Sequence, residues 1–241
     1  KKIWQVLSLD EGVEPSIKLF LLSWDGDEGY PGNLAVTVSY SLKNDGSLSI
    51  RYEANTDKRT LINLTNHTYF NLGGYSSGKI YDHELWLDAD TYLPTDDTLI
   101  PTGEIRSVEG TPFDFRLPKT IGRDIKINNQ DLIIAGGYDH CLNFVDGETQ
   151  LPKLRARAIH KASGRVMEMY TNQPCVQFYS GNFLTNTKYP FKNGVPQEIQ
   201  MAFCLETQHM PDSINHDNFT NVILNPGEKY DFTTIYKFFT E

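Results

Sequence analysis

The sequence lacks a long hydrophobic run, an excess of basic residues and any pair of cysteines at metal-binding or redox spacing. Without a long apolar run or a visible signal peptide, we expect no membrane-spanning segment and a cytoplasmic protein. The 31 acidic and 22 basic residues give a net charge of -9, which repels phosphate backbones and anionic membranes. We therefore expect neither nucleic acid nor a membrane as a partner, and we favour an uncharged ligand.

The three cysteines, at positions 141, 175 and 204, are widely spaced and odd in number, which is typical of buried thiols in a reducing compartment. The six histidines are scattered without ligand spacing, and there is no HExxH motif. The sequence therefore predicts no metal site. Phosphate-loop, dinucleotide-binding and GxSxG motifs are also absent, which argues against the classes of protein that use them.

Helical periodicity is also missing, and only residues 119–127 could form a turn or two of helix. By contrast, apolar and polar residues alternate in 34–42 and again in 48–55, and Asn44-Asp45-Gly46 between them predicts a hairpin turn. We expect further strands at 3–9, 61–70, 83–93, 154–160, 165–171, 176–180, 199–207 and 230–239, and long loops at 94–119 and 124–138. No repeat or linker divides the chain, so we expect one all-β domain over residues 1–241.

The predicted strand 61–70 carries the imidazole of His67, and both of its faces mix polar and apolar side chains. A half-buried strand would divide these side chains more cleanly, so the polar ones need partners from neighbouring strands or from a ligand. His67 is therefore a candidate site residue. On this segment alone, however, a core histidine within a buried polar ladder is the favoured interpretation.

Glu206 lies on the face of the predicted strand 199–207 that is opposite to its apolar side chains. Its neighbours on that face, Ala202 and Cys204, are short and would leave room for a ligand beside the carboxylate. The alternative is a solvated glutamate at a sheet edge, although cysteine is among the most buried residue types.

Asp139 follows two glycines, and an ionised carboxylate there would be a strong acceptor for sugar hydroxyls. It could equally cap a turn. Gln177, in another predicted strand, could contact a polyol or complete a ladder of side-chain amides. Together these residues favour acid–base chemistry without a metal on a neutral polyhydroxy ligand.

Several longer motifs occur in order along the chain. They are residues 63–72 (NLTNHTYFNL), 90–94 (DTYLP), 99–103 (LIPTG), 137–140 (GYDH), 177–182 (QFYSGN), 204–208 (CLETQ) and 225–230 (NPGEKY). In these motifs and their order, the chain resembles the aldose 1-epimerase (galactose mutarotase) family over essentially its whole length.

The resemblance implies a large, mostly antiparallel β-sandwich with very little helix and with a sugar site in an open cleft. It also implies interconversion of the α and β anomers of free aldohexoses such as galactose and glucose, without a cofactor. By motif, His67 corresponds to the general acid that protonates the ring oxygen, and Glu206 to the base that takes the anomeric hydroxyl proton. Asp139 and Gln177 match sugar-hydroxyl contacts, and Tyr69 lies beside the acid in the same motif.

The family pattern also has an upstream substrate-binding Arg and a second active-site His followed by two glycines. Residues 1–241 contain no counterpart of either. Because Lys1 falls about where the family continues after that motif, we expect an N-terminal portion of the domain to precede it.

Other functions stay open at this stage. The missing Arg and His would fit a β-sandwich that binds a monosaccharide without turnover, and Asp139 with Glu206 could form the carboxylate pair of a glycoside hydrolase. A sugar-phosphate epimerase would need a basic cluster, which is not obvious in this acidic chain. For the epimerase we expect a small monosaccharide as the partner and a monomer or weak dimer as the assembly.

Overall fold

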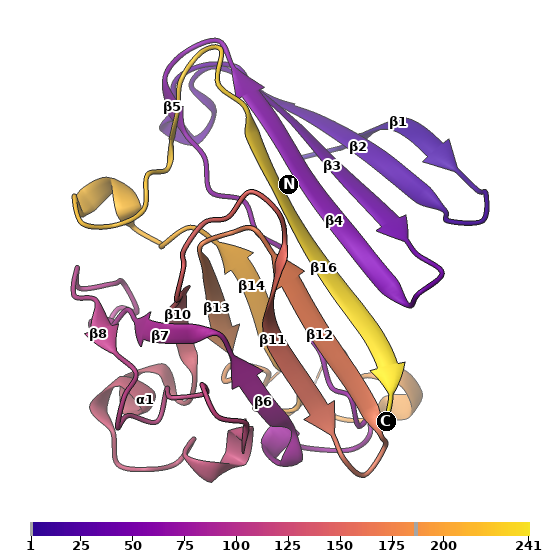
Figure 1. The fold of residues 1–241 in the computed structure, drawn as a ribbon, viewed down its shortest axis with the longest axis vertical. Helices are drawn as coiled ribbons and strands as arrows, with labels where there is room; N and C mark the ends of the chain where they lie inside the picture. Colours follow the sequence, from indigo (N-terminus) through magenta and orange to yellow (C-terminus); the bar gives the residue numbers. More distant parts are fainter. Residues whose placement is uncertain (1, 186–187) are drawn as a thin grey trace.

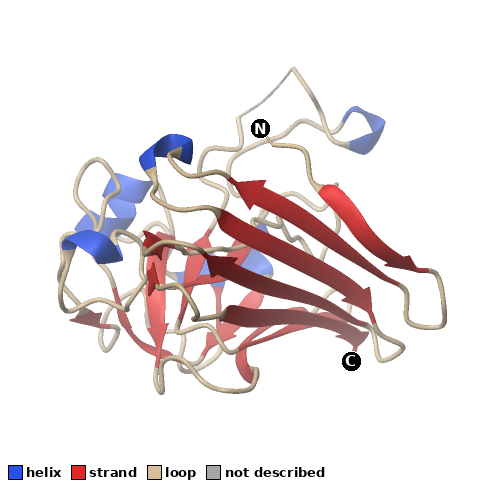
Figure 2. Ribbon diagram, turned by 90° about the horizontal axis from the view of Figure 1, so that it is seen from above, coloured by secondary structure: helices blue, strands red, loops and turns tan. Residues whose placement is uncertain are grey.

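The computed structural model describes residues 2–185 and 188–241, and its strands build two large sheets (Figure 1, Figure 2). The nine-stranded sheet has the order β1 (Gln5–Asp10), β2 (Ser16–Ser23), β3 (Leu34–Leu42), β4 (Ser47–Thr56), β16 (Tyr230–Thr240), β12 (Arg165–Thr171), β11 (Lys153–His160), β6 (Glu84–Leu87) and β9 (Lys119–Thr120). The five-stranded sheet has the order β14 (Cys204–Gln208), β13 (Cys175–Tyr179), β10 (Asp139–Phe144), β7 (Ala89–Tyr92) and β8 (Arg106–Ser107). A two-stranded ribbon joins β15 (Ile223–Leu224) to β5 (Thr60–Leu61).

Helix is confined to one α-helix, α1 (Gln130–Ala135), and to short 3-10 turns within the part of the chain that the structure describes. The turns are η1 (Asp27–Gly29), η2 (Ile80–Asp82), η3 (Ile121–Arg123), η4 (Lys192–Gly194) and η5 (Ser213–Asn215). In residues 2–185 and 188–241, no helix has the length and apolar character needed to cross a bilayer.

The predicted hairpin is confirmed as β3 and β4, which pair without a break from Leu34 opposite Thr56 to Leu42 opposite Leu48. Gly46 closes its turn with a φ of 84°. A Cβ atom there would lie 2.5 Å from the carbonyl oxygen of Phe238, so the turn requires glycine. Other predicted strands are found as β1, β11, β12, β13 and β16.

Two of the predicted strands are shorter in the structure, and one strand was missed. Of residues 61–70, only Leu61 lies in a strand and Phe70 makes a single bridge to Phe203, because the polar side chains between them form individual hydrogen bonds instead of a ladder. The strand predicted from residue 199 begins at Cys204. β2 was not predicted, because its run of apolar residues does not alternate.

The predicted strand 83–93 is divided at Asp88, where the chain passes from one large sheet to the other. Arg155, whose side chain is 1% exposed, donates from Nη1 to Asp88 Oδ2 at 2.7 Å and from Nη2 to the carbonyl oxygen of Gly147 at 3.1 Å. Because a buried guanidinium needs such partners, this ion pair fixes the crossing point between the sheets.

The helical predictions also need correction. Within residues 119–127, β9 is followed by the single 3-10 turn η3, so the helix expected there is present in part, whereas α1 lies inside the loop predicted at 124–138. The side chain of Asn129 caps α1 by accepting from the backbone amides of Asp131 and Leu132, and Gly136 ends it in the left-handed conformation. With a length of six residues, α1 is too short to show helical periodicity in the sequence.

The main hydrophobic core lies between the two large sheets, and it takes alternate residues from strands of both. Ile50 and Met167 come from the nine-stranded sheet, and Val176, Phe178 and Leu205 from the five-stranded one. The faces of β10, β13 and β14 that point away from this core are therefore free to carry polar side chains.

Tyr236 ties the sheets together within this core. Its fully buried hydroxyl lies 2.7 Å from the carbonyl oxygen of Leu205 in β14 and 3.0 Å from Asn66 Oδ1. We expect Tyr236→Phe to lower the free energy of unfolding by about 1–3 kcal/mol, because it leaves buried acceptors without a donor. Urea unfolding monitored by circular dichroism measures this loss.

The matched control is Tyr170→Phe, which removes a hydroxyl that bonds the neighbouring Glu168 on a partly exposed part of β12. It should change the unfolding free energy by no more than about 0.5 kcal/mol. Equal losses in the two variants would contradict a bridging role for Tyr236.

Candidate active site

The register of three neighbouring strands sets polar side chains in rows on the face of the five-stranded sheet that points away from the main core. The first row is Asp139–Tyr179–Cys204, and the second is Cys141–Gln177–Glu206. Because side chains two residues apart on a strand share a face, both rows lie on the same surface. The structure thus brings together three of the residues proposed from the sequence, namely Asp139, Gln177 and Glu206.

His67 reaches this surface on the irregular segment that follows β5. Asn63 anchors one end of the segment, since its amide group both donates to the backbone oxygen of His209 at 3.0 Å and accepts from its nitrogen at 2.9 Å. At the other end, Phe70 and Phe203 exchange backbone hydrogen bonds of 2.7 and 2.9 Å. His67 is thereby held over β14 without belonging to the sheet.

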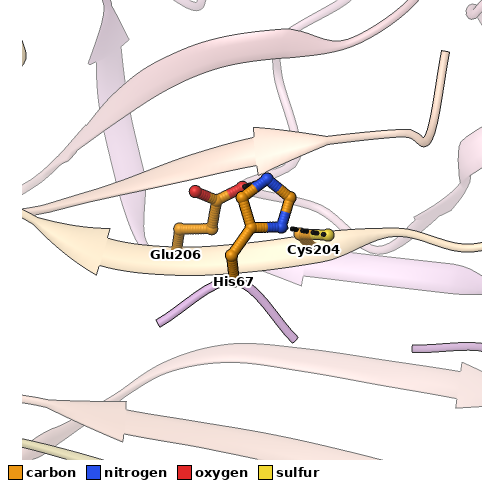
Figure 3. Close-up of side chains that lie close together, drawn as sticks. All are labelled: His67, Cys204 and Glu206. Carbon is orange, nitrogen blue, oxygen red and sulfur yellow. Dashed lines mark hydrogen bonds and ion pairs between the residues drawn. The ribbon is translucent and has the colours of Figure 1, made fainter. Parts of the chain in front are cut away.

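The imidazole of His67 lies between a carboxylate and a thiol (Figure 3). Its Nε2 is 3.4 Å from Glu206 Oε1, and its Nδ1 is 3.5 Å from Cys204 Sγ. The His67 side chain is 50% exposed and that of Glu206 is 10% exposed. A group that solvent can reach therefore faces a nearly buried carboxylate, which is an arrangement suited to proton transfer with a small ligand.

Two tyrosines flank the imidazole. The ring of Tyr69 stacks on His67 with centroids 5.0 Å apart, and Tyr179 meets His67 edge-on at 5.9 Å. The hydroxyl of the buried Tyr179 accepts a hydrogen bond of 3.0 Å from the backbone of Phe183. Sequence reasoning singled out Tyr69 but gave Tyr179 no role, although its position two residues after Gln177 places it on the same face of β13.

Asp139 and Gln177 are joined directly, because Gln177 Nε2 donates to Asp139 Oδ1 at 2.8 Å. The other end of the amide, Gln177 Oε1, is buried and has no partner among the described residues. A buried acceptor without a partner costs free energy, so this oxygen is suited to a donor that arrives with a ligand, such as a hydroxyl group.

The site shifts the pKa of its carboxyl groups upward. Burial, with a further contribution from the charge of Asp139, raises the pKa of Glu206 to about 7. Burial also raises the pKa of Asp139, against the hydrogen bond from Gln177 and the charge of His67. The pKa of the Cys204 thiol is raised too, mainly by burial, which keeps it protonated at neutral pH. Glu206 can therefore gain or lose a proton near neutrality.

Two residues close to Asp139, Gly137 and His140, face away from the site. Gly137 has a φ of 146°, and a Cβ atom there would lie 2.4 Å from Asn182 Oδ1. His140, the next residue after Asp139, points to the opposite face, where it is fully buried against Phe113. Burial lowers its pKa to about 4, so this histidine is neutral and lies outside the site.

The same cluster has the donor atoms of a metal site. His67, Cys204 and Glu206 each offer one atom, and these atoms lie within 4.8 Å of one another. Sequence spacing could not show this group, because His67 and Cys204 are 137 residues apart.

Comparison with known proteins gives consistent matches. The family model described as aldose 1-epimerase matches residues 1–237. Galactose mutarotase from Homo sapiens is 48% identical over 238 residues, which cover 99% of this chain and 66% of that protein. Aldose 1-epimerase from Escherichia coli is 37% identical over 243 residues, which cover 100% of this chain and 68% of that protein. This chain thus spans just under two thirds of the length of the mammalian relatives it matches.

Solved structures agree with this result. An aldose epimerase homologue from C. elegans has a TM-score of 0.84 at 30% identity, covering 98% of this chain and 68% of that chain. Galactose 1-epimerase from Lactobacillus acidophilus has a TM-score of 0.83 at 30% identity, covering 99% of this chain and 67% of that chain. These superpositions confirm the fold class expected from the sequence.

Burial of Glu206 has a cost that depends on pH. With a folded-state pKa of about 7 against an ordinary value of 4.5, the folded protein keeps a proton that the unfolded chain loses, so stability falls as pH rises between these values. As the pH rises through this range, the free energy of unfolding of Glu206→Gln should increase by roughly 3 kcal/mol relative to that of the wild type. Urea unfolding at a series of pH values measures the gain.

Glu109→Gln is the matched control, because it makes the same chemical change at an exposed loop position. Its stability relative to the wild type should stay constant over the same pH range. If the difference in unfolding free energy between Glu206→Gln and the wild type were also constant with pH, burial would not raise the pKa of Glu206.

Proposed function

The chain belongs to the aldose 1-epimerase family, and from this membership we propose that it interconverts the α and β anomers of free aldohexoses such as galactose and glucose. The observation that carries the proposal is the approach of His67 Nε2 to within 3.4 Å of Glu206 Oε1. These groups come from distant parts of the chain and meet on a sheet face that also carries Asp139 and Gln177.

The chemistry needs an acid and a base at the two ends of one hemiacetal. Glu206, as the carboxylate, takes the proton of the anomeric hydroxyl O1, while protonated His67 gives a proton to the ring oxygen O5. The C1–O5 bond breaks, the aldehyde rotates about C1–C2, and the ring closes on the other face of C1 with both proton transfers reversed. Since O1 and O5 are bonded to the same carbon, the two groups must lie close together, as His67 and Glu206 do.

The neighbouring residues supply positioning. Asp139 would accept hydrogen bonds from sugar hydroxyls, and the free Oε1 of Gln177 would accept another. The ring of Tyr69 stacks on the imidazole and Tyr179 contacts it edge-on, which limits its rotation and shields it in part from water. We propose these roles for the sequence-derived residues His67, Glu206, Asp139, Gln177 and Tyr69, with Tyr179 added.

We also propose that residues 1–241 act within one domain, as a cytoplasmic monomer or weak dimer, and that the reaction uses no cofactor. The acidic composition and the lack of a basic cluster favour a neutral monosaccharide over a phosphorylated one.

A second candidate is binding of the same sugars without turnover. It is favoured by Asp139 and the unpaired Oε1 of Gln177, which could bind sugar hydroxyls without taking part in proton transfer. Saturation-transfer NMR on galactose separates the two, because only turnover makes the exchange between anomers faster than it is in buffer.

Polarimetry on freshly dissolved α-D-galactose tests the proposed activity. We expect the protein to accelerate the change in optical rotation over buffer, and Glu206→Gln to lower the catalysed rate by about 10²- to 10⁴-fold because the base is lost. Binding of galactose to the variant should persist. Glu109→Gln should keep the wild-type rate, and a fully active Glu206→Gln would mean that another group is the base.

The pH profile of kcat/KM offers a sharper test. Because the base must be ionised, kcat/KM should fall as the pH drops below about 7, the pKa of Glu206. Asp139→Asn removes a negative charge that helps to raise this pKa, so the fall should move to lower pH, whatever the loss in overall rate. An unmoved profile would contradict the coupling, and complete loss of the pH dependence would assign it to Asp139 instead.

A further inference from the structure

We propose that His67, Cys204 and Glu206 also form an inhibitory site for a soft divalent cation such as Zn²⁺, which excludes the sugar. Among residues 2–185 and 188–241, this is the one group of three histidine, cysteine or acidic side chains whose donor atoms lie within 4.8 Å of one another. The inhibitory effect rests on the proposed function, whereas the binding itself does not.

The spacing of the donor atoms fits zinc. A tetrahedral ion with Zn–S of about 2.3 Å and Zn–N of about 2.0–2.1 Å separates its sulfur and nitrogen ligands by about 3.5 Å. In the structure, Cys204 Sγ and His67 Nδ1 are 3.5 Å apart. An ion can therefore enter between these two atoms with little movement of β14, which carries Cys204, or of the segment that carries His67.

Glu206 completes the set. A single ion binds one nitrogen of an imidazole, here Nδ1 of His67. In the structure, the carboxylate of Glu206 lies 3.4 Å from the other nitrogen, Nε2. To bind the same ion, this carboxylate turns away from Nε2 and toward the metal. Glutamate has enough side-chain torsions for this movement, and the half-exposed His67 leaves a fourth position for water. A donor set of nitrogen, sulfur and oxygen selects zinc or cobalt over magnesium and calcium, which prefer oxygen alone.

The charges of the bound state balance, although burial makes the Cys204 proton harder to remove. The Cys204 thiol releases its proton to solvent on binding, and thiolate and carboxylate together neutralise the charge of the ion. Asp139, in the row of Cys204, adds a further negative charge on the same face. Once metal is bound, His67 and Glu206 are no longer available for proton transfer, so the ion and the sugar compete.

Zinc titration of the mutarotation rate tests the inference. We expect inhibition that higher galactose concentrations relieve and that a chelator reverses. In Cys204→Ser, the zinc concentration that halves the metal-free rate of the variant should be higher than in the wild type by at least about 10- to 100-fold. Loss of a residue that only hydrogen-bonds a metal ligand already costs this much affinity, and loss of a ligand costs no less.

Cys175→Ser is the matched control. Cys175 is a buried thiol on β13 that bonds Asn143 and belongs to a separate small apolar cluster with Cys141. This variant should be inhibited by zinc like the wild type. Equal inhibition of Cys204→Ser and the wild type, inhibition unaffected by galactose, or activation by zinc would each overturn the proposal.

Binding of Co²⁺ gives a readout that does not depend on activity, and the decisive measurement is made on the wild-type protein. We expect wild-type protein and Cys175→Ser to show a thiolate-to-cobalt charge-transfer band that galactose suppresses. If mutarotation is absent but this band appears, the proposed function fails and the metal site stands. If the band is absent in wild-type protein, the metal site is wrong whatever the activity.

Discussion

The register between β10, β13 and β14 is the constraint on which the candidate site depends. It sets Asp139, Gln177 and Glu206 side by side while Leu142, Phe178 and Leu205 enter the core from the opposite face. A slip of one residue along any of these strands would exchange the two sets, burying carboxylates in the core and exposing its apolar side chains. The hydrophobic core therefore fixes the chemistry on the other side of the sheet.

Burial of the ionisable groups of the site costs folding free energy, and the same burial makes them suited to proton transfer. Two carboxyl groups and a thiol share one face, and burial raises the pKa of all three groups. A carboxyl group with a pKa of about 7 is a better proton acceptor than an ordinary glutamate, while still being ionised in a large fraction of molecules near neutral pH. The stability lost by burying Glu206 and the reactivity gained have the same physical origin.

Much of the fold could be predicted because its strands alternate cleanly. The hairpin of β3 and β4 was recognisable from its apolar periodicity and its Asn-Asp-Gly turn. Segment 61–70 was not, because its polar side chains satisfy each other and distant backbone groups singly, and such long-range bonds leave no periodic pattern. The helix α1 could not be distinguished from a loop either, because six residues are too few to show helical periodicity.

For the site, motifs and side-chain chemistry were enough to single out His67, Glu206, Asp139, Gln177 and Tyr69 as candidates. Their arrangement could not be predicted. The contact of His67 with Cys204, and the part of Tyr179 in enclosing the imidazole, depend on how an irregular segment crosses a sheet. No local sequence rule describes that crossing.

The hydroxyl of Tyr236 touches both the strand that carries Glu206 and the segment that carries His67. The separation between imidazole and carboxylate is thus set from inside the protein and not by the loops that surround the site. Surface loops can accumulate substitutions, insertions or deletions over evolution while this separation persists. Ligand preference can therefore diverge between homologues without each change disturbing the central pair.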